Sequence, residues 1–201
     1  MNSITGFIGY FKLQDWWLNS FTQEERNHIE QIFHPLGLSS DDNSLIEGEV
    51  GETDETAAGL LSALSGWFNN KQDRNLAKKI IAKAYSEAIT HNNILDLHFT
   101  LQMIIQIYYP DRDIDSEALN KTILACKEQI KIAKEASSAF KKDYPKNSLP
   151  SHVGYEQLRI IFKKKHQFQD GLDLCKQAKQ EGWQGNWDKE IEYFTNQMYK
   201  S

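Results

Sequence analysis

Apolar residues recur along most of the chain three or four positions apart, which is the spacing of one face of an α-helix. The pattern is clearest between Ser151 and Trp183, where two such runs follow one another. The first run contains Tyr155, Leu158, Ile161 and Phe162, and the second contains Leu172, Cys175 and Ala178. Ser151 follows Pro150 as a candidate N-cap, and Gly182 is placed to end the second helix. The stretch therefore predicts two amphipathic helices joined by a tight turn.

The same periodicity predicts helices through most of the remaining sequence. Their expected spans are 12–19, 23–33, 56–69, 73–90, 94–109, 116–141 and 188–199. Thr22-Gln-Glu-Glu25 has the form of a capping box, in which a threonine and a glutamate satisfy two free amides of the first turn. Pro35 marks the end of the helix that this box opens, and Pro110 marks the end of the helix at 94–109, because proline interrupts helical hydrogen bonding. We therefore expect an all-α fold.

The segment 116–141 has the most regular pattern. Its apolar seam alternates steps of four and three residues over about three heptads, as in a coiled coil. The seam consists of Leu119, Ile123, Cys126, Ile130, Ala133, Ser137 and Phe140. Packing along an antiparallel neighbour in the same chain accounts for this seam, and so does pairing with a second copy. We favour the first explanation, and the chain is expected to be a monomer or a homodimer.

The hairpin at 151–183 resembles a tetratricopeptide repeat (TPR), a helical hairpin with large residues on its first helix and small residues on its second. Tyr155, Leu158 and Phe162 match the first helix, and Gly171, Cys175 and Ala178 match the second. Arg159 and His166 stand where the family has glycine. Partial matches recur in the segments 56–90 and 94–141.

The resemblance implies an irregular stack of antiparallel helical hairpins, that is, a TPR-like α-solenoid. In this interpretation residues 1–55 form an aromatic-rich N-terminal helical cap followed by an acidic loop, and residues 56–201 form the repeat region. The helix at 188–199 would be the C-terminal capping helix that repeat proteins need. With 201 residues, both parts are expected to form one compact domain.

Charge is distributed unevenly along the chain. Residues 1–70 contain 11 acidic and two basic side chains, whereas residues 71–201 contain 17 acidic and 21 basic ones. Seven of the acids lie in the expected loop at 38–55, which contains no base and lacks the ligand spacing of an EF-hand. We therefore expect a mobile, solvated loop rather than a metal site, and no cofactor.

Cysteine usage and hydropathy bear on location. Cys126 and Cys175 fall on apolar helix faces outside any CxxC motif, so both are expected to be reduced core thiols. The N-terminus lacks the basic region of a signal peptide. The most apolar run, 101–109, is too short to cross a bilayer. These features favour a cytoplasmic protein with no membrane partner.

One group of polar and aromatic residues is a candidate ligand site. It consists of Asp96, His98, Tyr108, Tyr109 and Arg112, which His152 and Tyr155 would join if the hairpins stack. Histidine beside carboxylates serves acid–base chemistry or metal binding. Asp96 and His98 are two positions apart and point to different helix faces, however, so we favour packing and capping roles over a small-ligand sensor.

A second hypothesis is enzymatic. Arg159 and His166 resemble the R-x(4–6)-H signature of HEPN-type ribonucleases, which are also all-helical. The resemblance implies metal-independent RNA cleavage, in which arginine holds a phosphate and histidine transfers a proton. This reading requires the two side chains, seven positions apart, to share one helix face.

The function that we favour is non-catalytic binding of an unidentified protein or peptide partner, with a possible regulatory role. Nucleic acid is a weaker candidate, because the chain is acidic overall and no basic stripe interleaved with aromatic residues is visible. If the TPR resemblance holds, the groove-facing residues would be Asn69, Asn70, Thr100, Met103, Gln157, Lys163 and Lys164.

Overall fold

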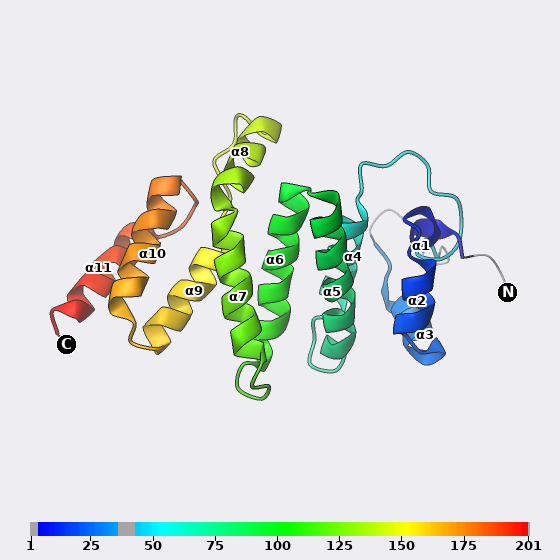
Figure 1. Ribbon diagram of the computed structural model, residues 1–201, viewed down its shortest axis with the longest axis horizontal. Coiled ribbons are helices and arrows are strands. Elements are labelled where there is room, and N and C mark those ends of the chain that lie inside the picture. Colours follow the sequence, from blue (N-terminus) through cyan, green and yellow to red (C-terminus); the bar gives the residue numbers. More distant parts are fainter. Residues whose placement is uncertain (1–3, 36–42, 201) are drawn as a thin grey trace. The chain divides into compact units, whose positions relative to one another are not determined.

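The computed structural model describes residues 4–35 and 43–200, and within these ranges it contains helices and no β-strand (Figure 1). The expected all-α fold is therefore confirmed. The chain forms two compact units, residues 1–87 and 88–201. The division falls inside a helix rather than at the expected boundary between residues 55 and 56.

The first unit begins with three short helices. They are α1 (Gly6–Tyr10), α2 (Gln14–Ser20) and α3 (Gln23–Ile32). The predicted capping box is present at the start of α3: the Glu25 amide donates to the Thr22 hydroxyl, and the Thr22 amide donates to the Glu25 carboxylate. Of the two neighbouring tryptophans, Trp17 is buried and Trp16 is half-buried, as expected for adjacent helical positions.

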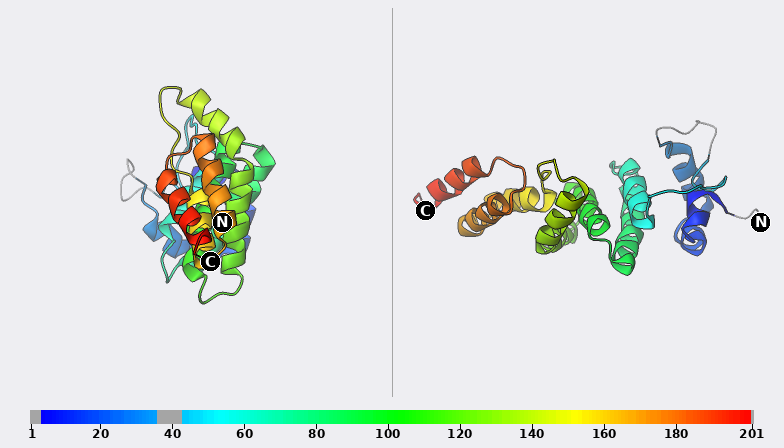
Figure 2. Two further views of the ribbon diagram at one scale, coloured as in Figure 1. Left: turned by 90° about the vertical axis from the view of Figure 1, so that its left-hand side faces the viewer. Right: turned by 90° about the horizontal axis from the view of Figure 1, so that it is seen from above.

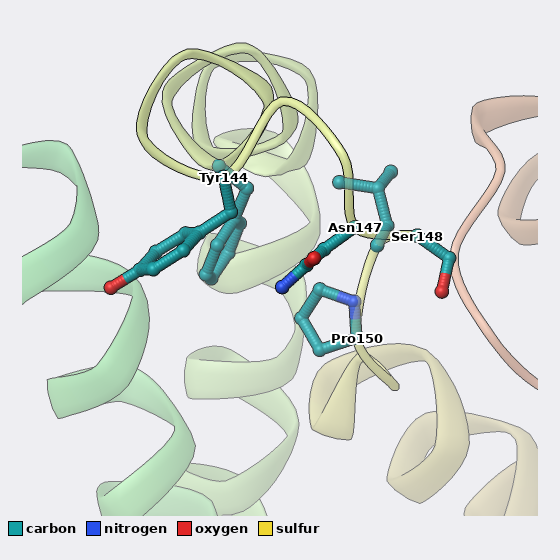
Figure 3. Close-up of a pocket in the computed structure, with 6 residues that line it drawn as sticks. Tyr144, Asn147, Ser148 and Pro150 are labelled. Atoms are coloured by element: carbon teal, nitrogen blue, oxygen red, sulfur yellow. The ribbon is translucent and has the colours of Figure 1, made fainter.

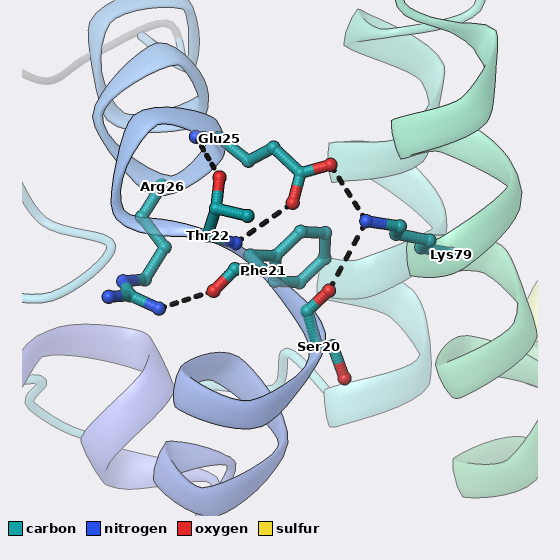
Figure 4. Close-up of polar contacts among 6 residues, drawn as sticks. All are labelled: Ser20, Phe21, Thr22, Glu25, Arg26 and Lys79. Atoms are coloured by element: carbon teal, nitrogen blue, oxygen red, sulfur yellow. Dashed lines mark hydrogen bonds and ion pairs between the residues drawn. The ribbon is translucent and has the colours of Figure 1, made fainter.

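Two longer helices complete this unit. They are α4 (Ala57–Trp67) and α5 (Arg74–His91), whose last turn belongs to the second unit. The Lys79 ammonium of α5 contacts the Glu25 carboxylate at 2.7 Å and the Ser20 carbonyl at 3.3 Å (Figure 4). The Phe33 ring packs edge-on against Trp67 of α4. These contacts join residues 57–87 to the N-terminal helices, which is why the unit extends beyond residue 55.

The predicted loop at 38–55 lies partly outside the described residues, and its described part is more ordered than expected. The amides of residues 5–8 donate to carbonyl groups of residues 44–48. These are amides that the first turn of α1 leaves without a helical partner. Gly6 has a positive φ of 54°, and a Cβ there would lie 2.5 Å from the Ser44 carbonyl oxygen. Leu45 is buried, so residues 44–48 form part of the structure of α1.

The second unit contains six α-helices and one 3₁₀ turn within its described residues. They are α6 (Ile94–Tyr108), η1 (Tyr109–Asp111), α7 (Ala118–Lys131), α8 (Ala133–Asp143), α9 (Val153–Lys164), α10 (Phe168–Glu181) and α11 (Trp187–Met198). Helix α7 packs against both α6 and α9, and α10 packs against both α9 and α11. The order is visible from above, where the helices from α6 to α11 follow one another in chain order (Figure 2).

The expected continuous helix at 116–141 is wrong, because Ile132 separates α7 from α8. The face that α7 buries is also shifted by one position from the predicted seam. Its buried residues are Ala118, Thr122, Ala125, Cys126 and Gln129. An apolar pattern could not identify this face, because two of its members are polar residues whose groups are satisfied by hydrogen bonds. The Thr122 hydroxyl donates to the Ala118 carbonyl, and the Gln129 amide bonds to two other helices.

The predicted hairpin is present as α9 and α10, with one correction at its start. The N-cap is His152, whose Nδ1 accepts from the Tyr155 amide, whereas Ser151 pairs with Gln184 in an isolated bridge. Gly182 ends α10 in the left-handed conformation, as predicted. Gly171 lies against Phe194 of α11, and a Cβ there would be 2.2 Å from the ring. Both cysteines are free and buried, as expected.

Candidate functional site

A buried cluster of histidine and aromatic rings lies in the second unit. His98 comes from α6, His152 caps α9, and Trp183 follows α10. The two imidazole centroids are 5.0 Å apart, and the Trp183 ring stacks on His98 at 5.6 Å and lies 4.6 Å from His152. Phe140 of α8 contacts both His98 and Trp183 through its ring edge. Four elements from separate parts of the sequence therefore meet at this cluster.

The environment of the two histidines keeps both rings neutral. Burial lowers the pKa of His98 to about 4. Burial also lowers the pKa of His152 to about 3, assisted by the repulsion that a charged His98 would exert. The Nδ1 of His98 and the Nε2 of His152 are buried and make no hydrogen bond to any described residue. Residues 4–35 and 43–200 contain no group of three or more His, Cys, Asp or Glu side chains that could hold a metal ion.

Hydrogen bonds lock the helices around this cluster. The Gln129 side chain of α7 donates to the His98 carbonyl at 2.9 Å and accepts from the Gly154 amide at 2.7 Å, so it joins α6, α7 and α9. The Tyr155 hydroxyl and the Trp183 indole nitrogen both donate to the Glu181 carboxylate, at 2.9 and 3.1 Å. Side-chain hydrogen bonds therefore hold together the helices that surround the cluster.

An apolar pocket opens on the outer side of Phe140. It has a volume of about 220 Å³ and is lined by Phe140, Tyr144, Asn147, Ser148, Leu149 and Pro150. Tyr144 approaches the pocket from the end of α8, and Asn147 and Pro150 approach it from the connection to α9 (Figure 3). Tyr144 is 57% exposed, and Phe99, whose ring lies 5.7 Å from Phe140, is 46% exposed. Two large aromatic side chains therefore stand in solvent beside the pocket.

Three lysines flank the lining residues in the sequence. Lys141 and Lys142 follow Phe140, and Lys146 precedes Asn147. All three are exposed, and no described residue forms an ion pair or hydrogen bond with them. Asp143, also exposed, is the one acidic residue between Phe140 and Pro150. The segment that supplies the pocket lining is therefore net positive, and these three lysines are called the lysine rim below.

The predicted ligand cluster divides into two groups in the structure. His98, His152 and Tyr155 come together in the buried cluster, with His152 and Tyr155 rings 4.8 Å apart. Tyr109 and Arg112 form a separate cation–π contact at 4.3 Å, and Lys164 donates to the Tyr109 hydroxyl.

The other members of the predicted cluster also lie outside the buried group. Lys121 lies 4.9 Å from the centre of the Tyr108 ring. Asp96 lies in the first turn of α6, where a carboxylate stabilises the helix dipole.

The predicted groove residues are divided between the two units. Asn69 and Asn70 belong to the first unit, where they bind Arg74 and Asp73 in the turn before α5. Thr100 is fully buried, so the prediction that it faces a groove is wrong.

The remaining groove residues belong to the second unit. Met103 and Gln157 are half-buried, and Lys163 is half-buried and paired with Glu190, a carboxylate that it shares with Arg159. Lys164 is exposed and lies beside Tyr109.

The geometry expected for the ribonuclease hypothesis is wrong. Helix α9 ends at Lys164, and His166 lies beyond it with a positive φ of 55°, so Arg159 and His166 do not share a helix face. The Arg159 guanidinium forms an ion pair with Glu190 at 2.6 Å and is not free to hold a phosphate.

Sequence reasoning missed the pocket. The available signal was the stretch 144–150, in which Tyr144, Leu149 and Pro150 place apolar groups in a connection that joins two helices. Connections between helices are usually polar, so apolar side chains there indicate either burial or binding.

No protein-family model, curated protein or solved structure matches the chain. No helix in the part of the chain that the structure describes is long and apolar enough to cross a membrane.

Proposed function

We propose that the second unit is a non-catalytic module that binds a protein or peptide by holding one large apolar side chain in the pocket beside Phe140. The observation that carries the proposal is the pocket itself, with exposed Tyr144 and Phe99 next to it. Partly exposed aromatic side chains around a small apolar hollow are the usual anchors of protein interfaces.

The size of the pocket supports a side chain rather than a metabolite as its occupant. A volume of about 220 Å³ is several times the roughly 30 Å³ that one water occupies in the liquid. It is smaller than the roughly 300–1,000 Å³ of sites that enclose drug-sized ligands. A single large apolar side chain of a protein or peptide partner fits a pocket of this intermediate volume.

The packing behind Phe140, on the inner side of the pocket, supports the same proposal. Phe140 packs on His98 and Trp183, and the helices behind it are joined by the buried Gln129. A preformed pocket loses little conformational entropy on binding, so more of the contact energy appears as affinity.

We further propose that the helices belong to an irregular, TPR-like repeat arrangement. Gly171, Cys175 and Ala178 are buried on α10, where small residues permit close approach of neighbouring helices. Repeat arrangements present extended surfaces to their partners, and the pocket lies beside the connection between α8 and α9.

In the experiment, peptides that bind the immobilised full chain are selected from a random display library. Their affinities are then measured by fluorescence anisotropy. We expect Tyr144→Ser to weaken binding by at least tenfold, because removing an aromatic anchor wall typically costs about 2 kcal/mol. The side chain is mostly exposed, so the variant should keep wild-type stability, which circular dichroism checks.

Tyr199→Ser is the matched control, since Tyr199 is 87% exposed and lies just after α11, far along the chain from the pocket lining. It should bind the selected peptides with wild-type affinity. A library that yields no specific peptide, or peptides that bind Tyr144→Ser as tightly as the wild type, would refute the proposed function.

A further inference from the structure

The lysine rim belongs to a basic segment of the second unit. Residues 88–201 contain 16 basic and 15 acidic side chains, so the unit as a whole is close to neutral. Between residues 131 and 150 there are five lysines and two acids. The segment that builds the pocket is therefore net positive within a unit that is close to neutral.

These charges are close enough to act on a bound segment. Consecutive Cα atoms are about 3.8 Å apart, so Lys141, Lys142 and Lys146 are attached one or two residues from lining positions. The Debye length is about 10 Å at 0.1 M salt, so ammonium groups that reach within this distance of a ligand in the pocket would attract it with limited screening. None of the three lysines is neutralised by a described residue.

We propose that the partner segment is an acidic peptide with a large apolar side chain, whose carboxylates face Lys141, Lys142 and Lys146 while the apolar group enters the pocket. This inference rests on the proposed function, because it names the kind of peptide that the same pocket takes. Complementary charge at an interface rim selects the partner and speeds its association.

An acidic peptide fits this surface better than a nucleic acid does. Nucleic-acid binding draws on a basic surface that follows several phosphates, whereas this unit is nearly neutral outside the rim. The pocket surface is largely apolar, which suits an apolar side chain, whereas single-stranded nucleic acids also need a basic groove that follows the backbone.

The test uses the peptides selected from the random display library together with two charge-reversal variants of the full chain. We expect the selected sequences to be enriched in Asp and Glu around an aromatic or large aliphatic residue. The variant Lys141→Glu with Lys142→Glu should weaken their binding on the order of tenfold, and raising NaCl from 0.1 to 0.5 M should weaken wild-type binding as well.

The control variant carries Lys176→Glu with Lys189→Glu. It makes the same change in net charge at exposed positions of α10 and α11, neither of which lines the pocket. It should retain most of the affinity. Equal losses in both variants would mean that net charge alone attracts the peptide, and would overturn the role of the rim.

The two proposals fail in different ways. Peptides that depend on Tyr144 but show no acidic enrichment, and that bind the Lys141→Glu, Lys142→Glu variant normally, would overturn the acidic partner and leave the proposed function standing. Tighter binding of a fluorescein-labelled single-stranded RNA than of any selected peptide would assign the rim to nucleic acid. Self-association of the wild-type chain in sedimentation experiments, if lost in the Lys141→Glu, Lys142→Glu variant, would show that the lysine rim binds a second copy of the chain instead.

Discussion

Acidification should destabilise the second unit through the buried pair His98 and His152. Both rings are neutral in the folded protein, with pKa values of about 4 and about 3, whereas an unfolded histidine titrates near 6.5. The unfolded chain therefore binds more protons than the folded chain once the pH falls below about 6.5. The stability that neutral burial provides is present above this pH and is lost progressively as the pH falls toward the folded values.

The magnitude follows from the same values. Between pH 7 and pH 5 each histidine should lower the free energy of unfolding by about 2 kcal/mol, so the pair should lower it by about 4 kcal/mol. At pH 5 both folded pKa values lie below the solution pH, so this loss depends mainly on the unfolded pKa. It is large beside the roughly 5–15 kcal/mol that stabilises a typical domain.

Amide hydrogen exchange measured by mass spectrometry at pH 7 and pH 5 reports this loss separately for each part of the chain. After correction for the intrinsic exchange rate, amides of α6 and α9 should lose about 4 kcal/mol of protection. In the variant His98→Phe with His152→Asn, which keeps a ring against Trp183 and a capping acceptor on α9, most of this pH dependence should disappear.

His166→Gln serves as the control, because His166 is exposed in the turn between α9 and α10. It should show the wild-type loss. A loss below about 1 kcal/mol in the wild-type chain, or an undiminished loss in the double variant, would refute the assignment of two buried neutral histidines.

Three further substitutions test the packing that supports the pocket and the first unit. Gly171→Ala should destabilise the docking of α11 by about 1–3 kcal/mol, because its Cβ would overlap the Phe194 ring, and exchange protection in α11 measures this. Gln129→Leu should cost about 1–3 kcal/mol in urea denaturation, because the buried Gly154 amide loses its acceptor. Thr22→Ala should cost about 1 kcal/mol in exchange protection of α3, because the capping box is lost.

Each substitution has a matched control. Gly51→Ala adds a methyl group where no atom lies within 4 Å, and Gln180→Leu replaces an exposed glutamine. Thr53→Ala removes an exposed threonine hydroxyl that caps no helix. All three should stay within about 0.5 kcal/mol of the wild type. A test variant that is no less stable than its control would contradict the corresponding contact.

The sequence predicted best those features that depend on neighbours along the chain. The helix starting after Thr22, the hairpin at 151–183 and its end at Gly182 all follow from capping groups and periodicity within a few residues. The prediction of the buried face of α7 failed, because contacts with residues distant in the sequence, rather than the local apolar pattern, decide which face is buried. Helix α7 buries Gln129 where the pattern predicted Ile130, because the Gln129 amide is satisfied by His98 and Gly154 from two other helices.

The candidate site shows the same division. Residues His98, His152 and Tyr155 were identified as candidates from their types, but their separation from Tyr109 and Arg112 depends on how α6, α8 and α9 pack. The pocket could not be predicted, because its lining needs Phe140 at the end of one helix to meet Leu149 and Pro150 in the following connection. Thr100 was misassigned because its burial is decided by neighbouring helices rather than by its own polarity.

The sequence by itself determined that this chain is helical, where most helices begin and end, and that both cysteines are buried, because helix propensity, capping and amphipathic spacing act within about one turn of the residue concerned. The tertiary structure alone decided which faces meet. It placed two histidines in a buried cluster, left Tyr144 and Phe99 exposed, and formed a small apolar pocket from Phe140 and the connection that follows α8. These outcomes depend on the packing of residues far apart in the chain, and a single sequence contains no direct record of that packing.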